Sequence, residues 1–481
     1  MTEKVDQTGL LKAGLTKRQM NMIAVGGVIG AGLFVGSGSA IAQAGPASII
    51  SYAAVGLLVV LVMRMLAELA VHSPETGSFA SYARRELGPW AGLATGWCYA
   101  YLWAVVVGFE ATAGAGILNR LIPVVPAWAA ALIFMTILTA SNLLSVRTFG
   151  TLEVWFASVK IAAIVAFLVI GAIAIAGLFP GVEPPGASNL LDNGGFAPNG
   201  YGQVVLAGLV VLFSYFGTEV VTIAAGEAED PHESVRHALR TVVVRVLVFY
   251  IGSVAVIVTL LPSSHKDITK SPFVATLDHL GIPYAGTAMD LVVMIAVLSC
   301  LNSGIYTCSR TLFAMAERGE APSALTKTSS RGVPAVAILA ASAGGFATVI
   351  ANYFLPTAAL FDFLLESTGC MALTIYIIIA ATQLRGRRNA DRTGVDLPLR
   401  MWGYPYVTWM VIAVLVVVGI GLAINGPTRH SLILSLVVSI VAIVGGLIYQ
   451  KRTNKPDPSV TPSWTAPRSP QQESVRGSDY L

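Results

Sequence analysis

The sequence predicts an all-α polytopic membrane protein with twelve transmembrane helices. Its 481 residues are 55% hydrophobic and only 12% charged. Apolar stretches recur from about Met20 to Tyr449, and each is close to the ~20 residues that a helix needs to cross the ~30 Å hydrocarbon core of a bilayer. A soluble fold cannot bury this much apolar surface. The function therefore concerns a molecule that crosses a membrane or sits in it.

Short polar loops separate the spans, and no stretch is long enough for an additional soluble domain. Residues 1–19 form a polar, basic cytoplasmic segment. The apolar run that follows lacks a cleavage signature, which indicates a retained anchor rather than a signal peptide. Residues 450–481 are rich in Pro, Ser, Thr and charge and are expected to form a disordered cytoplasmic tail. The membrane domain of residues 20–449 comprises the predicted spans 20–41, 47–71, 90–118, 126–144, 151–178, 202–226, 240–262, 287–309, 333–351, 358–383, 404–425 and 431–449.

The distribution of Lys and Arg predicts the orientation of the spans, because basic residues accumulate in cytoplasmic loops. With both termini on one side, that side receives most of the 30 basic residues, and a frame shifted by one span would spoil this division. Both termini are therefore expected to be cytoplasmic, and the net charge of +4 requires no nucleic-acid partner. The exceptions are four residues on the opposite side and two within spans, namely Arg120, Lys266, Lys270 and Arg429, and Arg64 and Lys160.

The positions of cysteine and histidine argue against a disulfide framework and a metal centre. All four cysteines lie inside predicted spans, no CxxC or His/Cys cluster is present, and all six histidines fall in loops or at span ends. The sequence thus predicts no metal and no cofactor, and it lacks the clustered nucleophile of a membrane enzyme. A proton path through the bilayer centre must use groups other than histidine.

Glycines interrupt two of the predicted helices. Six glycines fall between Gly26 and Gly38 in the first span, where each costs a helix up to ~1 kcal/mol relative to alanine. In the sixth span, Gly217 comes just before Glu219. Matching breaks in two halves of a membrane protein indicate a transporter's substrate site, and these predict an inverted repeat of spans 1–5 and 6–10 with two spans appended. Close helix packing at small residues is the alternative.

Three ionisable residues lie deep inside predicted spans. Such a residue costs about 2.5–3.5 kcal/mol to insert at a helix centre, so it is kept for a partner or a function. Lys160 lies well inside span five, Glu110 lies in the middle of span three, and Glu219 follows the break in span six. Burial favours the neutral form of all three groups, which predicts proton exchange, and carbonyl groups of an unwound helix are expected to hold a charged lysine. The alternatives are a static structural cation and hydrogen-bonded structural carboxyl groups.

Arg64 and Glu68 lie near the cytoplasmic end of the second span. They are four residues apart, which places them on one face of a helix. The sequence predicts that they form a structural pair.

Four segments follow one another in an order and spacing typical of one transporter family: GVIGAGLF at 27–34, 68–79, FSYFGTE at 213–219, and SCLNSGIYTCSR at 299–310. Over roughly residues 10–450 the chain resembles the amino acid permeases of the amino acid–polyamine–organocation superfamily, in its amino acid transporter branch. Within that branch it is most similar to γ-aminobutyrate permeases, through residues 63–68, 141–146, 194–200 and 221–225. Close relatives in that branch carry aromatic, basic or small neutral amino acids.

The resemblance implies a LeuT-like fold in the cell membrane and proton-coupled uptake of a small zwitterionic amino acid, γ-aminobutyrate above all, by alternating access. The partners are then the amino acid, protons and the lipid bilayer. A half-helix N-terminus offers free N–H groups and a positive dipole end to the substrate carboxylate. By analogy, substrate-binding residues are Ile29, Gly30, Ala31, Gly32, Glu110, Phe213 (the family's gating aromatic) and Phe216, and proton-coupling residues are Lys160, which replaces the ion of sodium-coupled relatives, and Glu219.

Other functions stay open at this stage. The ammonium of an ω-amino acid is expected at Glu110 or over an aromatic face through a cation–π contact. A permease for aromatic, small neutral or basic amino acids, an amino acid exchanger and a nutrient sensor all fit the same pattern. A channel would need a continuous polar pore, which isolated charges do not provide.

Overall fold

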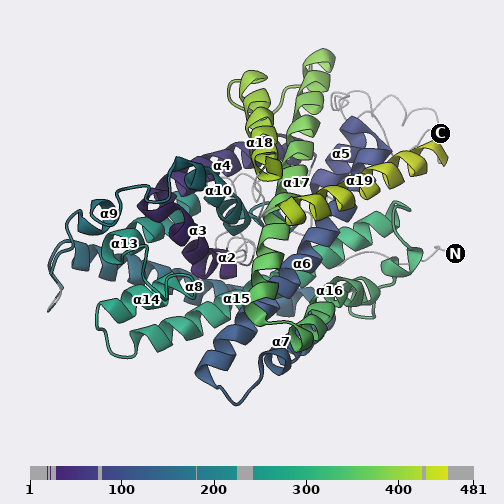
Figure 1. The fold of residues 1–481 in the computed structure, drawn as a ribbon. Helices are drawn as coiled ribbons and strands as arrows, with labels where there is room; N and C mark the ends of the chain where they lie inside the picture. Colours follow the sequence, from purple (N-terminus) through teal and green to yellow (C-terminus); the bar gives the residue numbers. More distant parts are fainter. Residues whose placement is uncertain are drawn as a thin grey trace, which may run out of the picture.

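The computed structural model describes residues 29–73, 78–179, 183–224, 242–424 and 429–452, and also Gln19, Met22 and Gly181. All regular structure in these ranges is helical (Figure 1). Most of the predicted terminal segments, residues 1–18 and 453–481, lie outside the described part of the chain. The helices are α2 (Ala31–Phe34), α3 (Gly36–Ala44), η1 (Gly45–Ala47), α4 (Ser48–His72), α5 (Ser78–Leu87), α6 (Pro89–Leu121), α7 (Ala127–Leu144), α8 (Val146–Ile175), α9 (Ser188–Leu191), α10 (Tyr201–Tyr215), α11 (Val220–Ala224), η3 (Arg245–Gly252), α13 (Ser253–Leu260), α14 (Pro272–His279), α15 (Ala285–Glu317), η4 (Ser323–Thr326), α16 (Ala335–Phe354), α17 (Thr357–Thr393), α18 (Tyr406–Ile424) and α19 (Arg429–Arg452).

Ten helical stretches in the described ranges are long and apolar enough to cross a membrane. The first of them, Ala31–His72, joins α2, α3 and α4, and α10 is a further, shorter apolar helix. The prediction of an all-α membrane protein with many spans is therefore confirmed.

Both predicted helix breaks are present. Ile29 and Gly30 are non-helical, α2 lasts four residues, and α3 begins after Val35. The sixth span breaks after α10, where residues 216–219 form a turn before α11. Gly217 adopts φ +95° in that turn, a backbone region that favours glycine. Gly26 and the residues up to Val28 lie outside the described part of the chain.

The two breaks lie against each other at the centre of the helix bundle. Ser214 on α10 donates a hydrogen bond from its hydroxyl to the carbonyl of Gly32 at 2.6 Å. α10 packs against α2, α3 and α4. The long helix α6 packs against α15, α16, α17 and α19, and it runs beside α15 through the middle of the molecule (Figure 1). The breaks are thus enclosed by helices rather than exposed to lipid.

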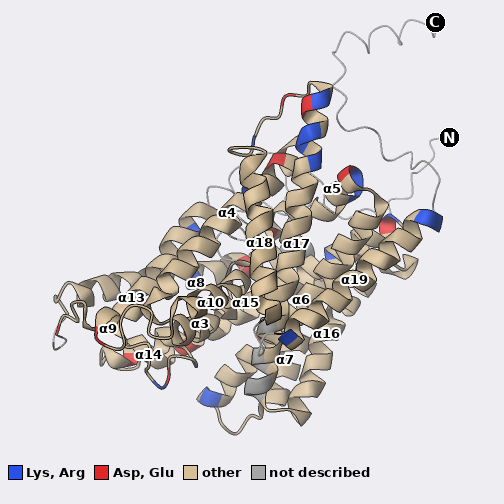
Figure 2. Ribbon diagram, turned by 45° about the horizontal axis from the view of Figure 1, so that its top comes forward, with Lys and Arg blue, Asp and Glu red and all other residues tan. Residues whose placement is uncertain are grey.

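Arg64 lies within electrostatic reach of Glu68, as predicted, but the direct contacts described for the two side chains are with other residues. Glu68 accepts a hydrogen bond from Gln383 at 2.9 Å and contacts Arg387 at 3.5 Å, both on α17. Arg64 lies 3.9 Å from the centre of the Trp402 ring. Because α17 extends to Thr393, it brings a cation directly to Glu68. Lys and Arg residues gather near this end of α17 and at the ends of α5 and α19 (Figure 2).

Arg245 departs from its predicted place in the cytoplasmic set of basic residues. Its side chain is only 1% exposed, and it opens the π-helical segment η3. The charged and polar groups whose electrostatic field reaches it include Glu219 and Tyr250. The charge count placed it on the cytoplasmic side because it lies near the cytoplasmic start of the predicted span 240–262.

Candidate functional site

Glu110 on α6 reaches into the break of the first span. The backbone N–H of Ala31 donates to both of its carboxylate oxygens, to Oε1 at 3.2 Å and to Oε2 at 3.1 Å. Both residues are buried. The N–H group that the sequence assigned to a substrate carboxylate is therefore bound in this structure by a carboxylate of the protein itself.

The backbone at this break is so closely surrounded that only glycine fits. A Cβ atom at Gly30 would meet Oε1 of Glu110 and would lie 2.6 Å from Cβ and 2.9 Å from Sγ of Cys300. A Cβ atom at Gly32 would lie 2.9 Å from Cα of Ser214 and 3.2 Å from the ring of Phe213. Real Cβ contacts almost never come this close, so the two glycines permit the approach of α6, α10 and α15.

Cys300 on α15 is a site residue that sequence reasoning missed. It appeared only as part of the segment 299–310, without a role of its own. The structure places it against Gly30, and its thiol also faces Glu110. The signal for it was present: a cysteine directly after a serine in the centre of a long apolar helix.

Lys160 on α8 is fully buried beside the same break. Its ammonium nitrogen donates to the carbonyl of Ile29 at 3.1 Å and to the hydroxyl of Ser299 at 2.8 Å. It also lies 3.8 Å from Oε1 of Glu153, which accepts a short hydrogen bond from Ser299. The expectation that a carbonyl of the unwound segment holds this lysine is confirmed. Glu153 was missed because it lies near the end of a predicted span, where a carboxylate is unremarkable.

Glu219 caps the break in the sixth span. It accepts hydrogen bonds from the backbone N–H of Gly217 at 3.0 Å and from the hydroxyl of Tyr99 at 3.1 Å. Tyr99 and Glu110 lie eleven residues apart on α6, which corresponds to a rise of ~16 Å. The structure thus places the two predicted carboxylates at different breaks, each bound to a backbone N–H group.

The two predicted aromatic residues divide in the same way. Phe213 meets Phe109 edge to face, with ring centres 4.7 Å apart, and lies beside Gly32. Phe216 stacks on Tyr376 at 5.8 Å. Phe213 therefore lies at the break of the first span, whereas Phe216 lies at the break that contains Glu219.

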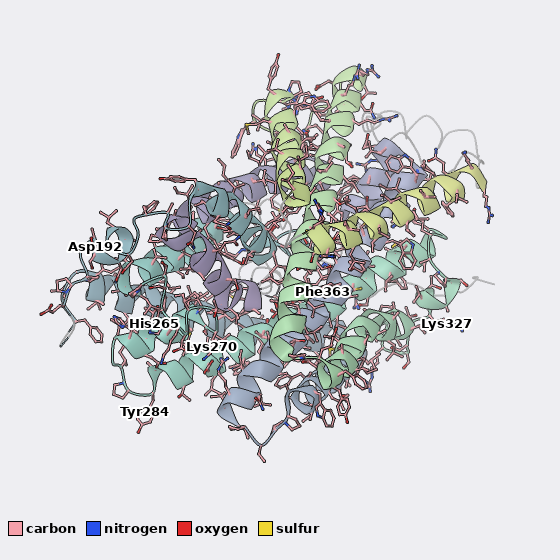
Figure 3. The ribbon with its side chains drawn as sticks, viewed as in Figure 1. Asp192, His265, Lys270, Tyr284, Lys327 and Phe363 are labelled. Carbon is pink, nitrogen blue, oxygen red and sulfur yellow. The ribbon has the colours of Figure 1, made fainter. Side chains whose placement is uncertain are left out.

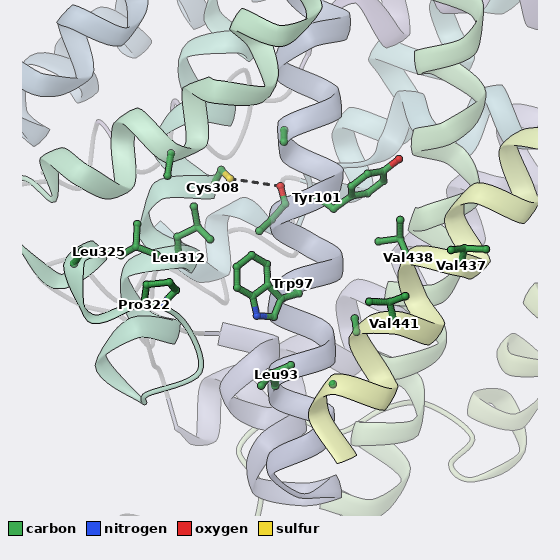
Figure 4. Close-up of a pocket in the computed structure, with 16 residues that line it drawn as sticks. Leu93, Trp97, Tyr101, Cys308, Leu312, Pro322, Leu325, Val437, Val438 and Val441 are labelled. Atoms are coloured by element: carbon green, nitrogen blue, oxygen red, sulfur yellow. Dashed lines mark hydrogen bonds between the residues drawn. The ribbon is translucent and has the colours of Figure 1, made fainter. Parts of the chain in front are cut away.

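Two cavities lie away from these residues. A cavity of about 810 Å³ between α6, α15, η4 and α19 is lined almost wholly by apolar side chains such as Leu93, Leu312 and Val438 (Figure 4). A second one of about 500 Å³ lies at α14 and includes His265 and Lys270 (Figure 3), with Arg120 and Asp290 paired at 2.5 Å on its wall. Neither contains a predicted site residue. Among the residues described, no group of His, Cys, Asp and Glu could hold a metal ion.

The amino acid permease family model matches the chain over residues 19–457. The chain belongs to the amino acid permease family. It is 45% identical over 447 residues to a gamma-aminobutyric acid permease of Bacillus subtilis (strain 168), covering 93% of this chain and 95% of that one. It is also 45% identical over 403 residues to the gamma-aminobutyric acid permease of Escherichia coli (strain K12), covering 84% and 86%. This permease is therefore a multi-pass membrane transporter rather than an enzyme.

A solved structure shares the fold of this permease. The crystal structure of a mutant manganese transporter from Eremococcus coleocola superposes with a TM-score of 0.56 at 15% sequence identity, covering 90% of this chain and 94% of that one. At this identity the likeness concerns the fold alone.

Proposed function

We propose that this permease couples the uptake of γ-aminobutyrate to the inward movement of protons. The substrate identity is supported by the two relatives above, which are named for this substrate and are 45% identical to the chain. The proton as driver is supported by Lys160, a fully buried cation that binds the unwound backbone of the first span.

We also propose twelve spans in a LeuT-like arrangement with both termini in the cytoplasm. The stretch Ala31–His72 contains the first two predicted spans, and α10 lies in the predicted sixth span. When Ala31–His72 is counted as two spans and α10 is added, the ten stretches become twelve spans. The breaks in spans one and six meet through Ser214 and Gly32, as an inverted repeat requires. The basic residues near the ends of α5, α17 and α19 support the orientation.

The observation that carries the mechanism is the position of two groups at one break. Lys160 holds the carbonyl of Ile29, and Glu110 holds the N–H of Ala31, two residues further on. In the proposed cycle the substrate carboxylate replaces Glu110 at that N–H, and the displaced Glu110 pairs with the substrate ammonium. The face of Phe213 then closes over the bound molecule. Loss of the proton from Lys160 weakens its hold on Ile29 and lets the broken segment move.

The test is uptake of labelled γ-aminobutyrate into proteoliposomes, with and without an imposed proton gradient, beside a panel of aromatic, small neutral and basic amino acids. We expect accumulation above the external concentration only with the gradient. Uptake that depends instead on internal amino acid would identify an exchanger. Preference for another member of the panel would replace γ-aminobutyrate as the substrate.

The two carboxylates are expected to respond differently to neutralisation. Glu110→Gln should weaken substrate affinity by about tenfold or more, because the group that takes the substrate ammonium loses its charge. Glu219→Gln should flatten the pH dependence of uptake with a smaller effect on affinity, because Glu219 lies at the other break, bound to Tyr99. Affinity and uptake measured from about pH 5 to about pH 8 distinguish these results. The reverse pattern would assign the two roles the other way round.

A further inference from the structure

We propose that Glu153 accepts the coupling proton from Lys160 and carries it toward the cytoplasmic side of the permease. The inference rests on the proposed proton coupling and adds a second residue to its path. Glu153 and Lys160 lie seven residues apart on α8, about two turns, and therefore on one face of the helix. The lysine side chain points back along the helix toward Glu153, as helical side chains do.

A serine hydroxyl lies between the two charged groups. Ser299 on α15 accepts a hydrogen bond from the ammonium of Lys160 at 2.8 Å and donates one to Oε1 of Glu153. Lys160 and Glu153 themselves are 3.8 Å apart, whereas a charge-assisted hydrogen bond between them would be ~2.7–2.9 Å long. The two groups therefore form an ion pair that the hydroxyl group of Ser299 bridges. A hydroxyl group can donate and accept at once, so it can pass a proton from one group to the other.

The hydrogen-bond directions define a balanced proton transfer. One N–H bond of the Lys160 ammonium breaks as its proton moves to Oγ of Ser299. At the same time the original hydroxyl proton of Ser299 forms a bond with Oε1 of Glu153. The products are a neutral amine, an unchanged serine and a neutral carboxylic acid. Burial favours neutral groups, so full enclosure of Lys160 and Glu153 lowers the free-energy cost of this state relative to the ion pair.

The surroundings of Glu153 continue the polar path away from the substrate break. Its second oxygen, Oε2, accepts no hydrogen bond from the described residues. Asn302 and Ser303, on the turn of α15 after Ser299, face the same carboxylate. Asn302 in turn accepts a hydrogen bond at 2.8 Å from Asn142, close to the end of α7.

This path has a direction. The backbone of Glu153 lies ~10 Å nearer than that of Lys160 to the start of α8, which follows directly on the end of α7. In the proposed orientation the turn between α7 and α8 faces the cytoplasm. A proton that moves from Lys160 to Glu153 has therefore moved inward, in the direction that drives uptake.

Other ionisable groups act on Lys160 from the remaining helices packed around it. Glu110 from α6, Cys300 from α15 and Arg245 from η3 contribute to its electrostatic surroundings. Of these, Glu110 is bound to the backbone of Ala31 and Cys300 lies against Gly30, on the substrate side of the break. Glu153 is the carboxylate joined to Lys160 through a hydroxyl group.

The test separates net proton movement from substrate exchange. Glu153→Gln retains a carbonyl oxygen that accepts the Ser299 hydrogen bond but cannot take up a proton. In proteoliposomes with an imposed proton gradient, we expect the accumulation ratio of labelled γ-aminobutyrate to fall from up to ~500-fold to near unity. Counterflow against internal unlabelled γ-aminobutyrate needs no net proton transfer, and we expect it to stay within about twofold of wild type.

The matched control is Glu320→Gln, which neutralises another buried carboxylate that pairs with Arg84 and Arg318 outside the site. It should leave both assays unchanged. Accumulation by Glu153→Gln at the wild-type level would overturn the inference, and so would equal loss of accumulation and counterflow in folded protein. If Glu153→Gln does not fold, Ser299→Ala must show the same split between the two assays, and its absence counts against the relay. Failure of wild-type protein to respond to the gradient would instead reject the proposed function.

Discussion

Lys160→Met is expected to insert into the membrane and to lose concentrative uptake. The substitution keeps an unbranched chain of similar length in α8, but it removes both the proton and the hydrogen bond to the carbonyl of Ile29. One proton supplies ~2.3 kcal/mol per 100 mV and ~1.36 kcal/mol per pH unit. At 100 mV and one pH unit the total of ~3.7 kcal/mol supports an accumulation of ~500-fold for a zwitterion. The variant should show an accumulation ratio near unity.

Loss of the lysine also leaves Glu153 buried without its cation, which by itself costs about 3–5 kcal/mol of stability. The double variant Lys160→Met with Glu153→Gln removes this unpaired charge and is the control for folding. It should restore stability without restoring accumulation. A correctly inserted Lys160→Met protein that concentrates γ-aminobutyrate as wild type does would exclude the lysine from coupling. Unlike Glu153→Gln, this variant should also change the rate of counterflow, because it removes the hydrogen bond that holds the broken segment at Ile29.

Gly30→Val is expected to abolish substrate binding. Its Cβ atom would collide with Oε1 of Glu110 and with Cys300, so the proposed carboxylate site at Ala31 would be blocked. The matched control is Gly36→Ala in the same span, where a Cβ atom would meet nothing nearer than 3.7 Å. We expect binding of labelled γ-aminobutyrate to fall by at least about a hundredfold in Gly30→Val and by less than about twofold in Gly36→Ala.

Folding must be measured beside binding for this pair, by thermal unfolding of the purified proteins. Folded Gly30→Val protein with unchanged affinity would remove the first-span break from the substrate site. If Gly36→Ala binds as weakly as Gly30→Val, the effect belongs to the flexibility of the span and not to the space beside Glu110.

The sequence predicted features that depend on one segment at a time. The break at Gly30 and the break at Gly217 follow from glycine in an apolar helix, and the depth of Lys160 follows from its distance to the span ends. The hydrogen bond from Lys160 to an unwound carbonyl was also anticipated. These predictions needed only the local cost of glycine and the free energy of burying a charge.

Features that depend on which helices touch were missed. Glu153 gains its meaning from Ser299, 146 positions away in the chain. Arg245 lies near a predicted span end, and only the packing of η3 reveals that it is buried. Glu68 makes its direct ion-pair contact with Arg387, because α17 supplies a cation that no local spacing rule contains. A single sequence does not specify such contacts between distant segments.

In the proposed cycle, the hydrogen bond between Glu110 and the N–H of Ala31 makes Glu110 an internal competitor of the substrate. A ligand that binds there must displace that carboxylate, so binding is an exchange of one anion for another. A fatty acid of the same length as γ-aminobutyrate would displace Glu110 without supplying a cation, and would leave the carboxylate of Glu110 buried and unpaired. A zwitterion supplies that cation, because its ammonium group pairs with the displaced carboxylate. The contact between Glu110 and Ala31 thus selects against simple carboxylates, without any other residue of the binding site having to recognise the ammonium group.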